Sequence, residues 1–202
     1  MKNPFPTQRV QLSRETIDFA IWEGTELYNN RVRVRPSDTL ETKITNSLLG
    51  AFGQQVMVNE LGARRVTKEE CPDFAYDVVV NHDELLEWTG YRNRKQDVQT
   101  RDARIEIKDL GMATRKFISF YDGNVNHARK CAKNERYDYM VCFGVNNFSR
   151  REYTADVNLI GILTAATVST ESRLWRDSNF KADMKYLVAS EVNTANAGLV
   201  FL

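Results

Sequence analysis

The residues of this chain whose types and spacing are best suited to chemistry are Asp77, Glu106 and Lys108. Glu106 and Lys108 close a segment, residues 104–108, in which polar and apolar residues alternate, and this period is typical of a strand with one buried face. The alternation predicts that Glu106 and Lys108 share a face while Ile107 points into the core. Asp77 opens an apolar run, residues 77–80, which predicts a second, buried strand.

This set of groups suits the hydrolysis of a phosphodiester bond. That reaction needs a hard cation to polarise a phosphoryl oxygen and to lower the pKa of the attacking water. Magnesium prefers carboxylate, carbonyl and water oxygens. Asp77 and Glu106 can supply the carboxylates and the backbone of Ile107 a carbonyl oxygen, while the Lys108 ammonium can hold the water or offset phosphate charge.

Two helices are predicted ahead of these strands. The first begins at Ser13, a suitable N-cap, and is followed by apolar residues at helical spacing. The second begins after Asp38, with Glu41 as the partner in a capping box, and stops at Gly62. Its apolar stripe consists of Ile44, Leu48, Phe52, Val56 and Leu61.

The rest of the chain predicts a sheet with helices on its faces. Strands are expected at 116–121, 137–145, 157–165 and 186–189, and a helix at 124–134. Residues 85–91 predict a second strand or an excursion, followed by a loop that continues to Asp102. Two helices, a meander of strands, a helix and further strands indicate an α/β fold with a mixed sheet flanked by helices and an N-terminal helical arm.

Residues 40–165 resemble the PD-(D/E)XK nuclease superfamily, which includes restriction endonucleases, junction resolvases and repair nucleases. In that family an Asp precedes or opens an apolar strand and a Glu/Asp-x-Lys lies on the next strand of a hairpin, as Asp77-Val-Val-Val and Glu106-Ile-Lys do here. The segment 50–61 looks like the family's first helix, 137–143 like the strand after its second core helix, and 159–163 like a later strand. The resemblance implies a single restriction-endonuclease-like domain over 1–202, with its core at about 40–165 and a helical extension over 1–37.

The function that the resemblance implies is a metal-dependent endodeoxyribonuclease using Mg²⁺, or Mn²⁺ as a substitute. Asp77, Glu106 and Lys108 would be its catalytic residues, and Asp77, Glu106 and the Ile107 carbonyl would hold the cation. Two alternatives stay open: a structure-selective nuclease for branched or damaged DNA, and an inactive DNA-binding or assembly module that keeps the fold.

Three further residues are candidates for the same site. Gln54 stands where the family's helix often has Glu; its amide can hold a water but brings no charge, which favours the inactive module. Glu60, later on that helix, is a candidate to compensate, although its helical offset does not favour it. Asp73 falls on the same predicted strand face as Asp77 and is its rival; we prefer Asp77 because the apolar strand runs directly from it.

The net charge of +1 excludes binding of nucleic acid by bulk electrostatics. Basic residues nonetheless cluster at 31–35, 64–65, 92–95, 101–104, 115–116, 129–130 and 150–151. The long insertion between the two candidate catalytic strands is therefore the predicted DNA-contacting element, and a solvated hairpin tip is the alternative. The basic residues of the insertion are Arg92, Arg94, Lys95, Arg101 and Arg104.

A homodimer is compatible with the resemblance, because restriction-like enzymes often pair two active sites.

The composition, with 42 % hydrophobic and 27 % charged residues among 202, is that of an ordinary globular protein. No apolar run approaches the roughly 20 residues of a membrane span, and the polar start lacks the apolar core of a signal peptide, so a cytoplasmic location is expected. Its three cysteines and two histidines show no metal-ligand spacing, which favours reduced, partly buried thiols.

Overall fold

The structure, a computed structural model, describes residues 7–31, 36–67, 69–72, 75–89, 102–111 and 130–166. Its centre is a six-stranded sheet in the order β1-β6-β5-β4-β3-β2. β4 and β5 run parallel, and the other neighbouring strands pair antiparallel, so the sheet is mixed. The strands are β1 (Gln8–Gln11), β2 (Arg64–Arg65), β3 (Val78–Asn81), β4 (Asp102–Gly111), β5 (Tyr139–Ser149) and β6 (Thr154–Thr164).

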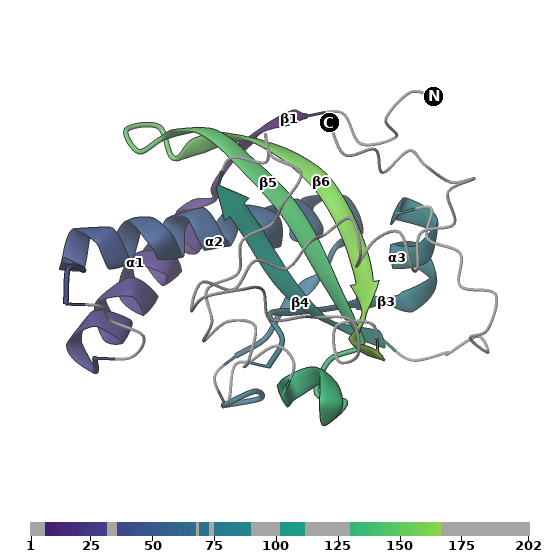
Figure 1. Ribbon diagram of the computed structural model, residues 1–202. Helices are drawn as coiled ribbons and strands as arrows, with labels where there is room; N and C mark the ends of the chain where they lie inside the picture. The colour runs from purple at the N-terminus through teal and green to yellow at the C-terminus, as the bar shows by residue number, and fades with distance from the viewer. Residues whose placement is uncertain are drawn as a thin grey trace, which may run out of the picture.

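Helix α2 (Leu40–Leu61) lies across one face of this sheet and α1 (Arg14–Asn29) lies beside α2, with one end of the pair projecting past the strands (Figure 1). A shorter helix, α3 (His82–Thr89), follows β3 directly. The prediction of an α/β fold with a mixed sheet and flanking helices is therefore confirmed. Among the described residues, no helix is both long enough and apolar enough to cross a membrane.

The ends of α1 and α2 follow from their capping residues. Ser13 caps α1, as predicted, by accepting the N–H of Thr16 at 3.2 Å. The prediction that Asp38 caps α2 is wrong: Thr39 has the extended backbone of an N-cap and its hydroxyl accepts the N–H of Thr42, while Asp38 pairs with Lys43 at 3.1 Å. α2 ends at Gly62, whose φ of 58° lies in the left-handed region.

The core forms where the apolar stripe of α2 meets the central strands. Leu48, Phe52 and Val56, which the sequence assigned to this stripe, are fully buried. They belong to one hydrophobic cluster with Ile105 of β4 and Val141 of β5. The stripe therefore orients α2 over the strand that carries Glu106 and Lys108.

The segment after β3, for which the sequence left a strand or an excursion open, does not continue the sheet. Residues 82–89 form α3 and not a strand, because the Asn81 side chain accepts the N–H groups of Asp83 and Glu84 at 3.0 and 3.1 Å and so starts a helix. β1 and the two-residue β2 were not predicted. Of the predicted helix 124–134, the described part is helical over 130–133. The predicted strands 116–121 and 186–189 lie outside the described residues.

Candidate active site

The candidate site lies where β3 stops pairing with β4. The β3–β4 ladder ends with Val78 opposite Ile105, whereas β4 continues alongside β5 as far as Gly111. Asp77, the residue before β3, donates its N–H to the Ile105 carbonyl at 2.8 Å. Its side-chain oxygen Oδ2 accepts the N–H of Ile107 at 2.7 Å. The Asp77 carboxylate thus occupies the edge of β4 that β3 leaves open.

Glu106 and Lys108 lie side by side on β4, as strand alternation requires. The Lys108 ammonium donates to the Glu106 carboxylate. Glu106 is buried, with 4 % of its surface exposed, while 20 % of the Lys108 side chain remains exposed. The Ile107 side chain points the other way, into the core. The N–H and C=O groups of one strand residue face the same neighbouring strand. Because the Ile107 N–H binds Asp77, the Ile107 carbonyl also lies on the Asp77 side of β4.

The cluster of Asp77, Glu106 and Lys108 carries an excess of negative charge when all three side chains are ionised. Burial, and then the negative charge of Glu106, raise the pKa of Asp77 from 3.8 to about 7, although Lys108 and the Ile107 N–H oppose the shift. The side chains of Asp77 and Glu106 carry one negative charge more than Lys108 neutralises when all three are ionised. A cation bound between the carboxylates would remove this imbalance.

The donor set fits one hard divalent cation. Two carboxylates, one backbone carbonyl and water oxygens match what Mg²⁺ binds, because that ion keeps several waters and needs few protein ligands. Among the described residues, no group of three or more His, Cys, Asp or Glu side chains converges on a point where a metal ion could sit. The proposed ligand set has only two carboxylate side chains, those of Asp77 and Glu106. Its third protein ligand is the backbone carbonyl of Ile107.

The structure brings one of the three additional candidates to the site. Gln54 of α2 donates its side-chain N–H to Asp77 Oδ1 at 3.4 Å. Glu60 is exposed on another face of α2, because six residues at about 100° per residue turn it well away from Gln54. Asp73 lies outside the described residues.

Sequence reasoning missed Asp109, which lies on the opposite face of β4 from Glu106 and Lys108. Its Oδ2 accepts the backbone N–H of Gly53 in α2 at 2.9 Å. Its Oδ1 is buried and has no hydrogen-bond partner among the described residues. Burial raises the pKa of Asp109 well above its usual value. The signal was present in the sequence, since an acidic residue stands at a position that the alternation assigns to the buried face.

Tyr137 was also missed as a neighbour of the site. It is buried, with 1 % of its surface exposed. Burial, and then the negative charge of Glu106, raise its pKa above the usual value for tyrosine. The Tyr137 phenol therefore stays neutral and forms part of the enclosed surroundings of Glu106.

The basic residues near the site are mostly engaged or outside the described residues. Arg104 binds Asp138 through two side-chain contacts, at 3.1 and 3.0 Å, in addition to its backbone N–H at 2.8 Å, so its guanidinium fastens β4 to the start of β5. The other basic residues of the insertion, Arg92, Arg94, Lys95 and Arg101, lie outside the described residues.

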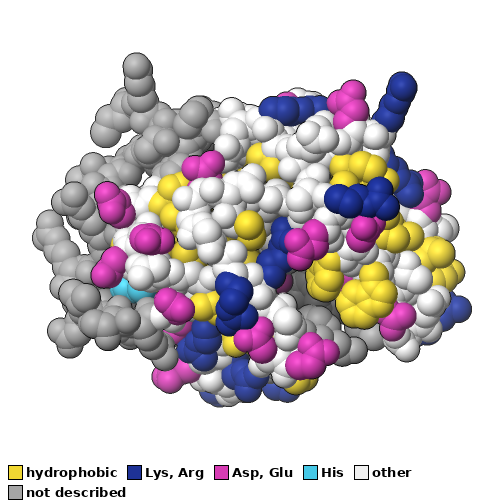
Figure 2. Space-filling view, turned by 180° about the vertical axis from the view of Figure 1, so that it is seen from behind, with side chains coloured by type: hydrophobic (Ala, Val, Ile, Leu, Met, Phe, Trp, Pro, Cys, Tyr) yellow, Lys and Arg dark blue, Asp and Glu magenta, His cyan; other side chains and the backbone are white. Residues whose placement is uncertain are grey.

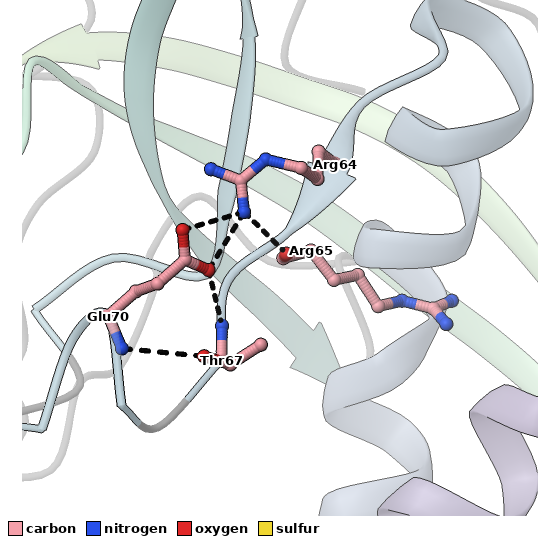
Figure 3. Close-up of polar contacts among 4 residues, drawn as sticks. All are labelled: Arg64, Arg65, Thr67 and Glu70. Carbon is pink, nitrogen blue, oxygen red and sulfur yellow. Dashed lines mark hydrogen bonds and ion pairs between the residues drawn. The ribbon is translucent and has the colours of Figure 1, made fainter.

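Arg64 and Arg65 show why neighbouring basic residues need not form a basic patch. Their side chains leave β2 in opposite directions (Figure 3). Arg64 binds the Glu70 carboxylate at 2.8 and 2.9 Å, and Glu70 also accepts the Thr67 N–H, which closes the turn after β2. Arg65 instead reaches Thr16 of α1. On the face shown in Figure 2, Lys and Arg side chains are interspersed with Asp and Glu.

Comparison with known proteins adds no assignment: no family model matches the chain, and no curated protein and no solved structure matches it.

Proposed function

We propose that this protein is a metal-dependent endonuclease that hydrolyses DNA phosphodiester bonds at Asp77, Glu106 and Lys108. The observation that carries the proposal is the position of the Asp77 carboxylate at the open edge of β4, bound to the N–H of Ile107 and close to Glu106. Residues far apart in the sequence thereby bring two carboxylates, a carbonyl and an ammonium together at one edge of the sheet.

The roles of the residues follow from their chemistry. Asp77, Glu106 and the Ile107 carbonyl would hold a divalent cation. When bound, Mg²⁺ would polarise the phosphoryl oxygen and lower the pKa of the attacking water. The partly exposed Lys108 would offset the negative charge that develops on the phosphate in the transition state. Gln54 would orient the Asp77 carboxylate through its amide.

The order of the elements also supports the proposal. A helix, α2, precedes an Asp at the start of strand β3; the antiparallel neighbour β4 carries Glu-x-Lys; and the parallel strand β5 follows. This order is the one that the resemblance to the PD-(D/E)XK superfamily implies. We accordingly propose a restriction-endonuclease-like core for the chain, with DNA as its substrate.

A second candidate function is a DNA-binding or assembly module of the same fold that does not cleave. The contact between Gln54 and Asp77 favours this alternative, because a neutral amide stands where the related enzymes often provide a third carboxylate. The retained ion pair of Glu106 with Lys108 favours catalysis. Cleavage separates the two, since an inactive module would bind DNA and leave it intact.

The test is cleavage of a supercoiled circular plasmid, which only an endonuclease can open. We expect opening that requires Mg²⁺ or Mn²⁺, stops with a chelator, and is abolished in Asp77→Asn and Glu106→Gln. The matched control is Glu60→Gln, which makes the same change at an exposed position of α2 and should cleave like the parent. Parent-level cleavage by either site variant, or no cleavage by the parent with any divalent cation, would overturn the proposal.

A further inference from the structure

A hydrogen bond joins Asp109 of β4 to Gly53 of α2. Asp109 Oδ2 accepts the Gly53 backbone N–H at 2.9 Å. Gly53 lies in the interior of α2, where an N–H ordinarily donates to the carbonyl four residues earlier. A side-chain acceptor at that place is a specific link between the helix and the strand, made on the face of β4 opposite to Glu106 and Lys108.

The packing around Gly53 shows that this link is built for close approach. A Cβ at position 53 would lie 2.6 Å from Phe143 Cδ2 and 2.7 Å from Ile107 Cγ2, and it would also collide with Asp109 Oδ1. A Cβ at Gly50, one turn earlier, would have nothing within 4 Å. The absence of a side chain is thus needed at Gly53 and not at Gly50, and it lets α2 approach β4 closely beside Asp109.

The next residue of α2 after Gly53 is Gln54, whose amide lies 3.4 Å from Asp77 Oδ1. In a helix the backbone of one residue determines where the next one lies, so the height and rotation of α2 at Gly53 set the reach of Gln54. We propose that Asp109 is a positioning residue of the candidate active site: by binding α2 at Gly53, it places the Gln54 amide against the Asp77 carboxylate. Its consequence for cleavage rests on the proposed function, whereas its effect on Gln54 does not.

Asp109 is not itself suited to share a cation with Glu106. Strand alternation places the two side chains on opposite faces of β4, and Asp109 is turned towards Gly53. The carboxyl acts through the helix, in the way that residues behind a metal site hold its ligands in place.

The first test uses the side-chain amide signals of the glutamines in a ¹H–¹⁵N spectrum without added metal. In Asp109→Ala the Gln54 signal should move towards its position in Asp77→Asn, because both changes weaken the same contact. The Gln55 amide, bound to Asn59 at 2.8 Å, is the internal control and should stay in place. Asp109→Asn, which keeps an acceptor for Gly53, should retain the parent Gln54 signal. If Asp109→Ala does not fold, Asp109→Ser takes its place.

The second test is a double-mutant cycle on Mn²⁺ affinity, measured by calorimetry. Asp109→Ala and Gln54→Ala should each weaken binding by about tenfold or more, as loss of a residue that orients a ligand does. The double variant should bind Mn²⁺ no more weakly than Gln54→Ala alone, because Asp109 acts through Gln54. Gly53→Ala should reproduce the effect of Asp109→Ala, and the matched control Gly50→Ala should bind Mn²⁺ like the parent.

An unmoved Gln54 signal in Asp109→Ala, or additive losses of Mn²⁺ affinity in the cycle, would overturn this inference even if the parent cleaves DNA. A parent that does not cleave, but whose Gln54 signal depends on Asp109, would overturn the nuclease proposal and support the positioning role.

Discussion

The Asp77 carboxylate accepts the backbone N–H of Ile107 at 2.7 Å, at the point where β3 no longer pairs with β4. A side chain thereby takes the hydrogen bond that a strand partner would otherwise make. The contact also fixes Asp77 relative to Glu106 and Lys108, the residues on either side of Ile107. The charges around this hydrogen bond determine how the protein should respond to substitution and to pH.

Replacement of Lys108 should affect the reaction much more than the fold. Lys108→Ala should lower the cleavage rate by about a hundredfold or more, because its charge acts mainly as negative charge develops on the phosphate. Affinity for uncleaved DNA, measured in Ca²⁺, should change little. The control is Lys133→Ala, which removes an exposed lysine. Cleavage by Lys108→Ala at the parent rate would exclude this role.

Asp77 should make the stability of the metal-free protein depend on pH. The pKa of Asp77 is about 7 in the folded protein, whereas its ordinary value is 3.8. The folded state therefore holds the carboxyl proton of Asp77 more tightly than the unfolded chain does. The resulting stability is present at low pH and is lost as the pH rises from about 4 through about 7. Asp77→Asn should therefore have a higher Tm than the parent at pH 8, and this advantage should shrink towards pH 4. If the Tm of the parent and the Tm of Asp77→Asn depend on pH in the same way with chelator present, the proposed charge imbalance at the site is wrong.

DNA binding should depend on the insertion between β3 and β4. Replacing Arg92, Arg94 and Lys95 with Ala should weaken binding and flatten the slope of log affinity against log salt by about 0.9 for every DNA phosphate that the variant no longer binds. The control is Arg14→Ala, which also replaces an arginine with alanine, on the exposed surface of α1. Mn²⁺ affinity should be unchanged in both variants. Parent-like affinity and slope in the insertion variant would remove the insertion from the DNA interface.

The positions of the main elements could be predicted because their sequence patterns are strong. The apolar stripe of α2 and the alternation in β4 each correspond to a buried face. The pairing of β3 with β4, which brings Asp77 beside Glu106, was implied by the resemblance and not by these patterns. Of the two alternatives for residues 85–91, a strand or an excursion, the strand is wrong over 85–89, because the periodicity took no account of Asn81, whose side chain caps a helix there.

What escaped prediction depends on contacts between distant segments. Gly53 lets α2 pack closely on the sheet, but nothing local in the sequence pairs it with Asp109. The ion pair between Arg104 and Asp138 was not predicted, because the register of β5 against β4 is what makes Asp138 the neighbour of Arg104. Such partners are set by the register of the sheet, which composition and spacing do not specify.

The most direct test is a crystal structure of the protein soaked in Mn²⁺, read from the anomalous signal of the metal. We expect one Mn²⁺ peak at the open edge of β4, at about 2.1 Å from oxygens of Asp77, of Glu106 and of the Ile107 carbonyl, with waters completing the shell. A peak elsewhere, or no peak at this edge while the two carboxylates remain ordered, would contradict the proposed metal centre.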